Sequence, residues 1–303
     1  MNTIIYLKMT KFLFINCGIH DKNRESIAAI LNYLMKAQRI EYKIGSVSDI
    51  PNYDVIYSAS ETINTALYPN KKFIFGPHFS VFPIQSQLKS LQATAYKNSI
   101  YIQPSEWSAS VWQQLGAEEF LPIKVFPFSV NTNRFQPVSS VTIRENVFVY
   151  FKRRHPQELH QLKEYLQIQH ITNYRIFDYT KKYNEQDYLN YLQTCQYGII
   201  LDAHESQGFA IEEALACDVP LLVWNAQTMN QEHGSHYGAI SCTSIPYWSP
   251  ACGEYFHSAA ELPLTFQTFK KKLQEKQYKP RDYILANLST EKCAERFMEI
   301  MIK

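Results

Sequence analysis

The sequence has no run of 18 apolar residues, no long run of charge of one sign and no Cys-x-x-Cys pair. The first absence argues against a helix that spans a bilayer. The charge balance is 30 basic against 28 acidic residues, a net charge of +2, which argues against a nucleic-acid partner. The 6 cysteines are scattered along the chain, so reduced thiols in a cytoplasmic protein are the simplest interpretation.

Common cofactor and metal motifs are also absent. There is no Gly-x-Gly-x-x-Gly and no P-loop, which argues against dinucleotide-dependent oxidoreduction and P-loop ATP hydrolysis. The 9 histidines include no His-Glu-x-x-His pair. We therefore expect no metal site and no required cofactor, and we interpret His204 as a loop residue rather than a ligand.

The length of 303 residues and the hydrophobic content of 46% fit about two globular domains. Lys8 and Lys11 interrupt the apolar N-terminus, and no small-residue cleavage pattern follows, so a strand is expected there rather than a signal peptide. Strands and helices then alternate, which favours an α/β fold with parallel sheets. The expected strands are Lys11–Asn16, Asp54–Ser58, Lys72–Phe75, Ser99–Gln103, Asn146–Phe151, Tyr174–Tyr179 and Tyr197–Leu201. The expected helices are Arg24–Ala37, one from Ser105 through Leu115, Pro156–Gln167, Asn184–Gln196, Phe266–Leu273 and a last one capped by Ser289.

The most informative stretch runs from Leu201 to Trp224 and reads LDAHESQGFAIEEALACDVPLLVW. The apolar run that leads into it does not alternate, which predicts a strand buried on both faces. Glu205 lies in the loop after that strand, and Glu213 lies in the following helix, with seven residues between the two. The free N–H groups at a helix start can bind a phosphate. The two oxygens of a carboxylate can accept hydrogen bonds from two vicinal hydroxyls. The stretch therefore predicts that Glu213 binds a ribose and Glu205 a second sugar at the carboxyl edge of the sheet.

This stretch resembles the Glu-x7-Glu signature of the retaining GT-B glycosyltransferases of the group 1, or family 4, type. The matching residues are Glu205, Gly208, Phe209, Glu213, Ala214, Ala216, Cys217 and Pro220. Asp218 replaces the usual glycine, and an aspartate tolerates the left-handed conformation that a helix C-terminus often requires. The alternative is a plain βαβ crossover with solvated glutamates. The resemblance implies a GT-B fold, with two Rossmann-like domains whose parallel sheets face each other across a cleft.

A second passage, Pro127–Pro137, resembles the end of the first domain in that family. The matching residues are Val130, Thr132, Phe135 and Pro137, and the departures are Ser129 and Asn131. The resemblance implies an acceptor-side domain of residues 1–137, completed by a C-terminal helix at 289–303, and a nucleotide-sugar-binding domain of residues 138–288.

The basic cluster Lys152, Arg153 and Arg154 follows the expected strand Asn146–Phe151. In the family this position carries Gly-Arg and, further on, a lysine, so the match is partial and does not single out one cation. Cations at a strand end are well placed for a diphosphate, and the alternative is a solvated basic turn. The other candidate site residues are Glu205, Ser206, Gln207, Gly208, Phe209, Glu213, Tyr179, Gly18 and His78.

The resemblance gives several of these residues a role. Glu205, His78 and Arg153 are the candidate catalytic residues, and Gly18 and His78 would approach the donor phosphate and sugar from the first domain. For His78 a structural role is an equal alternative, because a lone histidine is as often structural as functional. Tyr179 would stack on the nucleotide base, although a core or rim tyrosine is an equal alternative.

By resemblance, the protein is expected to transfer a sugar from a GDP- or UDP-linked donor to a hydroxyl of a glycan, glycoprotein or lipid-linked glycan. An Asp-x-Asp pair is absent, so lysine, arginine and helix N–H groups would neutralise the leaving diphosphate without a metal. The alternatives are a GT-B sugar-nucleotide epimerase and a non-catalytic nucleotide-sugar-binding module. Peripheral membrane contact is left open, because lipid-linked acceptors are common in the family.

Overall fold

A computed structural model describes residues 9–15, 18–59, 61, 63–77, 98–139, 141 and 143–302. The chain forms two compact units: unit 1 comprises Met1–Ser129 with Thr290–Lys303, and unit 2 comprises Val130–Ser289. This division falls earlier than the boundary after residue 137 that the sequence suggested. The reason is that Val130 and Phe135 belong to the buried core of unit 2.

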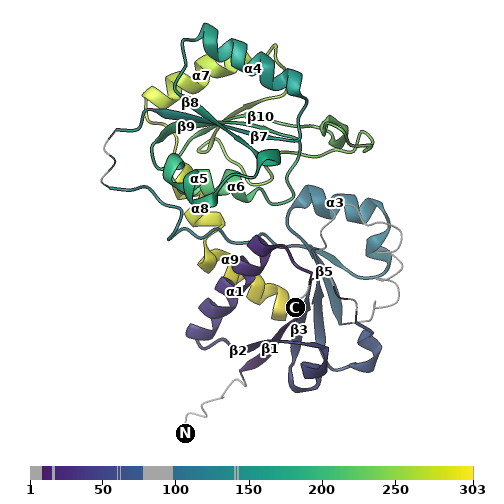
Figure 1. Ribbon diagram of the computed structural model, residues 1–303. Helices are drawn as coiled ribbons and strands as arrows, with labels where there is room; N and C mark the ends of the chain where they lie inside the picture. The colour runs from purple at the N-terminus through teal and green to yellow at the C-terminus, as the bar shows by residue number, and fades with distance from the viewer. Residues whose placement is uncertain are drawn as a thin grey trace. The chain divides into compact units, whose positions relative to one another are not determined.

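Unit 1 is built on a parallel sheet with the strand order β2-β1-β3-β4-β5-β6. Its strands are β1 (Thr10–Ile15), β2 (Ile40–Gly45), β3 (Val55–Ser58), β4 (Lys72–Phe75), β5 (Ser99–Gln103) and β6 (Ile123–Val125). Its helices are α1 (Asp21–Lys36), α3 (Glu106–Gln114) and α9 (Thr290–Ile302). Helices α1 and α9 lie side by side on one face of this sheet, and α3 lies on the other (Figure 1).

Helix α9 joins unit 1 although a whole unit separates it in sequence. The ring of Phe297 lies 5.6 Å from that of Phe12 and 5.0 Å from that of Phe126, centroid to centroid. The Lys72 ammonium donates a hydrogen bond of 2.8 Å to the carbonyl of Ile300 near the end of the helix. Aromatic burial and a charge-assisted cap therefore attach α9 to this sheet.

Unit 2 is built on a second parallel sheet, with the strand order β11-β10-β9-β7-β8. Its strands are β7 (Asn146–Lys152), β8 (Tyr174–Asp178), β9 (Cys195–Asp202), β10 (Leu221–Trp224) and β11 (Gly253–Phe256). Its helices are α4 (Pro156–Ile168), α5 (Glu185–Leu192), α6 (Phe209–Ala216), α7 (Leu262–Gln274) and α8 (Pro280–Asn287). Helices α4 and α7 cover one face, and α5, α6 and α8 cover the other (Figure 1).

Strand β9 is buried on both faces, as its unbroken apolar run predicts. Tyr197, Ile199 and Leu201 pack toward the α4 and α7 side, whereas Ile200 packs toward the α5, α6 and α8 side. Gly198 leaves room for the Phe148 ring, because a Cβ there would lie 2.1 Å from Phe148 Cε1. Neighbouring strands can thus approach with a large side chain between them.

One sequence expectation about helices was wrong. The helix expected to run to Gln196 ends at Leu192, because Cys195 already belongs to β9. Pro280 begins α8, where its fixed φ and missing N–H fit the first turn. Asp218, by contrast, has a φ of +60°, which confirms the left-handed conformation expected there. Within the described ranges, none of the helices is both long and apolar enough to cross a membrane.

Candidate functional site

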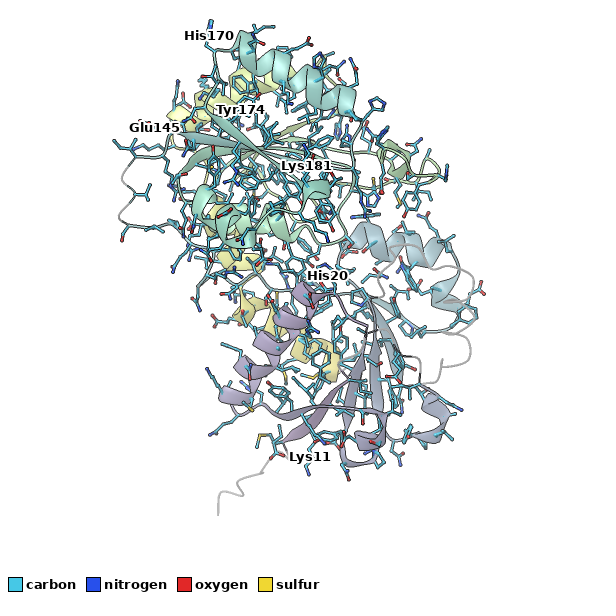
Figure 2. All side chains as sticks on the ribbon, in the orientation of Figure 1. Lys11, His20, Glu145, His170, Tyr174 and Lys181 are labelled. Carbon is cyan, nitrogen blue, oxygen red and sulfur yellow. The ribbon has the colours of Figure 1, made fainter. Side chains whose placement is uncertain are left out.

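The candidate site lies in unit 2, beyond the carboxyl ends of β7 and β9. The chain passes from β7 to β8 on one side and then returns to place β9 on the other side of β7. Ligands of doubly wound sheets bind at such a point of reversal. Figure 2 labels Tyr174 and Lys181 at the two ends of the neighbouring β8 segment, and Lys181 marks the carboxyl end.

Lys152 and Asp202 are the last residues of these two central strands, and they are register partners. The Lys152 ammonium donates a hydrogen bond to Oε1 of Glu205, in the loop after β9. Both of these side chains are 15% exposed, whereas Asp202 is fully buried. The strand ends therefore bring one cation and two carboxyl groups into a nearly dry cluster.

The charges in this cluster perturb one another. Burial alone lowers the pKa of Lys152, but Glu205 and Asp202 raise it above its usual value. Burial raises the pKa of Glu205, but the lysine beside it brings the pKa below its usual value. Burial raises the pKa of Asp202 well above its usual value, and the charge of Glu205 adds to this effect against the opposing effect of Lys152. At neutral pH the cluster thus contains a charged lysine and an ionised Glu205.

Tyr179 borders the cluster from the turn after β8. The Lys152 Nζ lies 4.8 Å from the centre of its ring, and the Arg153 Cζ lies 5.9 Å from it. The tyrosine side chain is 43% exposed. A ring that lies against two cations and is still open to solvent is suited to stack on a planar ligand.

Arg153 and Arg154 have opposite environments. The Arg153 side chain is 51% exposed and donates a hydrogen bond of 3.2 Å to Glu232 Oε1. Its φ of +53° is unusual for a residue with a side chain, and backbone of this kind concentrates at functional sites. Arg154 is 1% exposed, pairs with Glu158 and donates to the carbonyls of Asp202 and Trp224. Of the predicted cations, Arg154 is therefore a structural residue, whereas Lys152 and Arg153 lie where a diphosphate could reach them.

The sequence did not identify Glu232 as part of this neighbourhood. Its Oε2 lies 2.7 Å from the Nε2 of His204, and both side chains are 10% exposed. Burial lowers the pKa of His204 below its usual value, although Glu232 acts in the opposite direction. Glu232 lies in the long loop after β10, so no local pattern connects it to the Glu205 loop. The expectation that His204 is a loop residue agrees with this pairing.

The loop from Glu205 to Phe209 leads directly into α6. Gly208 is the N-cap residue and has a φ of +93°, which favours glycine. Glycine offers no side-chain oxygen to the first turn, so the cap contributes only backbone. The half-buried Ser206 precedes Gln207, whose amide donates a hydrogen bond of 2.8 Å to Glu212 Oε1. The helix start thus lies beside Glu205, because a Cβ at Gly208 would lie 3.5 Å from the Glu205 Cβ.

Glu213 lies on α6 and is 5% exposed. Burial raises the pKa of Tyr183 to about 12, and the charges of Glu213 and Glu205 both add to this rise. The two glutamates of the signature therefore act on one common neighbour. Since each carboxylate offers two acceptor oxygens, this arrangement can bind hydroxyl pairs on two sugar rings.

The first-domain candidates are less well defined. Gly18 is exposed, follows β1 and has a φ of +56°. His20, labelled in Figure 2, caps α1 by accepting a hydrogen bond from the Lys22 amide. His78 lies outside the described residues. In the described part of the chain, no group of three histidine, cysteine, aspartate or glutamate side chains is arranged to hold a metal ion.

Known proteins resemble this chain in fold. No family model and no curated protein matches the sequence. A glycosyltransferase from Rickettsia africae has a similar structure, with a TM-score of 0.61, 13% identity, and coverage of 97% of this chain and 98% of that one. AviGT4, a glycosyltransferase involved in avilamycin A biosynthesis, has a TM-score of 0.57, 12% identity and 96% coverage of each chain. The apo form of WaaB, a lipopolysaccharide outer core galactosyltransferase, has a TM-score of 0.56 and 11% identity, with coverage of 96% of this chain and 99% of that one. The chain therefore has the GT-B fold, with two Rossmann-like units.

Proposed function

We propose that this protein is a retaining glycosyltransferase of the family 4 type, which moves a sugar from a UDP- or GDP-linked donor to an acceptor hydroxyl. The observation that supports this proposal most is the Lys152–Glu205 pair beside α6 at the strand reversal of unit 2. The acceptor would be a glycan, a glycoprotein or a lipid-linked glycan. The GT-B fold supports this assignment, because it is the fold of the glycosyltransferases that the chain resembles.

Each part of the donor has a matching group in unit 2. Glu213 accepts hydrogen bonds from the ribose hydroxyls, and Glu205 accepts them from the donor sugar. Lys152 and Arg153 bind the diphosphate with the start of α6, and Tyr179 stacks on the base. When Lys152 moves from Glu205 to the diphosphate, the Glu205 carboxylate gains acceptor capacity for sugar hydroxyls.

The proposed reaction breaks the bond between the anomeric carbon and the phosphate oxygen, and it forms a bond from that carbon to the acceptor oxygen. The acceptor proton passes to the departing phosphate, on the same face of the sugar, so the anomeric configuration is retained. Lys152 stabilises the negative charge that develops on the phosphate, because its raised pKa keeps it charged. No metal is required in this proposal.

In this proposal unit 1 binds the acceptor. We also propose a cytoplasmic protein, with peripheral membrane contact if the acceptor is lipid-linked.

A thermal-shift screen with UDP-glucose, UDP-galactose, UDP-N-acetylglucosamine, GDP-mannose and GDP-fucose tests the proposal. A ligand at a hundredfold its dissociation constant stabilises by about 2.7 kcal/mol, which such a screen detects. Incubation with the bound donor and no acceptor then separates a transferase from an epimerase, which would release an altered sugar and free nucleotide. If no nucleotide sugar shifts the melting temperature, the proposal fails.

A further inference from the structure

Asp202 is an acid that neither the motif nor the proposed donor contacts use. It ends the central strand β9 and is fully buried. Its backbone carbonyl accepts hydrogen bonds from Arg154 and, at 2.8 Å, from the Ser244 hydroxyl, so its position is fixed. In the described ranges, neither of its carboxyl oxygens accepts a hydrogen bond of ordinary length and angle from an N–H or O–H donor.

The Glu205 carboxyl explains this arrangement, because it lies within hydrogen-bonding reach of the Asp202 carboxyl. The nearby Ala203 amide donates to the Lys152 carbonyl at 3.1 Å, and its lowering of the Asp202 pKa is smaller than the rise caused by burial and by Glu205. Two ionised carboxylates both accept and repel each other, so a hydrogen bond between them requires one proton.

The charge balance of the cluster points the same way. Two ionised carboxylates against the single ammonium of Lys152 would leave a net negative charge in a dry site, which is costly. One retained proton makes the cluster neutral. Because Lys152 already donates to Glu205, the remaining proton completes a chain from Lys152 through Glu205 to Asp202.

We infer that Asp202 is a positioning residue, which holds a proton against Glu205 and so fixes the Glu205 carboxylate where it meets the donor sugar. The role in sugar binding rests on the proposed function, whereas the shared proton does not. Burial raises the pKa of Asp202 well above its usual value, in agreement with a proton retained at neutral pH. The charged or titratable groups that face this carboxyl are Lys152 and Tyr150 of β7, Glu205 after β9, Arg154 before α4, and Cys242 in the loop after β10.

Infrared difference spectroscopy tests the proton without any ligand. At pH 7 the wild-type protein minus Asp202→Asn should show the carbonyl-stretch band of one neutral carboxylic acid. The control Asp187→Asn changes a side chain on α5 that is 59% exposed, and its difference spectrum should lack this band. The buried acid Glu212 is present in both proteins of each difference spectrum, so its band cancels. If Asp202→Asn removes no neutral-acid band, the inference is overturned, whatever the protein catalyses.

Two variants whose side chains have the same branching and the same number of heavy atoms test the positioning role. Asparagine at 202 can donate to Glu205, whereas leucine cannot. The ligand for this test is the nucleotide sugar that shifts the melting temperature of the wild-type protein. Its dissociation constant should be about tenfold higher for Asp202→Leu than for Asp202→Asn, the scale of one lost hydrogen bond. Both variants should bind UDP or GDP alone equally, because Glu205 meets the sugar. Equal affinity of the two variants for the nucleotide sugar would overturn the positioning role. If no nucleotide sugar binds to the wild-type protein, the proposed function fails and the positioning role fails with it, and the infrared result alone decides the shared proton.

Discussion

Lys152 and Asp202 face each other in register at the ends of β7 and β9, yet the lysine forms its ion pair with Glu205 in the next loop. The Glu205 carboxylate thus lies between the Lys152 ammonium and the Asp202 carboxyl. Substrate anions would compete with Glu205 for the same ammonium. In the proposed function, stability and donor binding are therefore linked through a small set of buried charges.

Lys152→Met should destabilise unit 2, because it leaves Glu205 buried without its cation. We expect a loss of about 3 kcal/mol in the free energy of unfolding, the scale for one partner removed from a buried pair. Adding Glu205→Gln to this variant should recover part of the loss, since the uncompensated charge is then gone. Urea denaturation of the single and double variants measures the coupling.

The control for this cycle is Lys163→Met, which changes an exposed lysine on α4. Its effect should stay within about 0.5 kcal/mol. A double variant that is as unstable as the sum of the two single variants would show that the pair is not coupled.

Asp202→Asn should change how stability depends on pH. The folded-state pKa of Asp202 is raised, so its stabilising contribution is present below the unfolded pKa of about 3.9 and declines as the pH rises toward the folded value. The decline is about 1.4 kcal/mol per pH unit. The free energy of unfolding of the wild type minus that of the variant should therefore fall between pH 5 and pH 7 in urea denaturation. A difference that stays constant would mean that Asp202 is ionised in the folded protein.

Replacing Arg154 should cost much more stability than replacing the adjacent Arg153. Arg154→Met removes a buried guanidinium from Glu158 and from the carbonyls of Asp202 and Trp224, so we expect a loss of about 3 kcal/mol of stability. Arg153→Met removes a half-exposed pair with Glu232 and should cost less than about 1 kcal/mol. Thermal denaturation compares the two variants, and similar losses would contradict the separate roles given to them.

Glu213→Ala should weaken binding of the nucleotide by about 1–3 kcal/mol, the scale for a hydrogen bond to a charged group. Isothermal titration calorimetry with UDP and GDP measures this change. Glu164→Ala provides a matched control, because Glu164 is also a helical glutamate but is 61% exposed. Unchanged affinity in Glu213→Ala would count against ribose binding by this residue.

The sequence was sufficient to predict the parallel α/β architecture and the neighbourhood of Lys152 and Glu205. Parallel strands end at one edge of a sheet, so residues that follow an apolar run are brought together there. The left-handed Asp218 also followed from its place after a helix. These inferences needed only local pattern and chain direction.

The other features depend on tertiary contacts. Glu232 meets His204 only because the loop after β10 folds back, and no spacing in the sequence encodes that return. Arg154 looks like its neighbours in sequence, but its position in the turn directs it into the core. Asp202 was overlooked because it belongs to the motif stretch without matching the motif. Its burial became visible only with β7 beside it.

The packing of Phe297 against Phe12, Tyr57 and Phe126 has a consequence for biosynthesis. On the ribosome, α9 emerges after all of unit 2, so the first sheet to be translated waits for its last covering helix. During that interval α1 can cover its own part of this face, but the aromatic rings of β1 and β3 that α9 covers stay exposed. The unit made first is thus completed last.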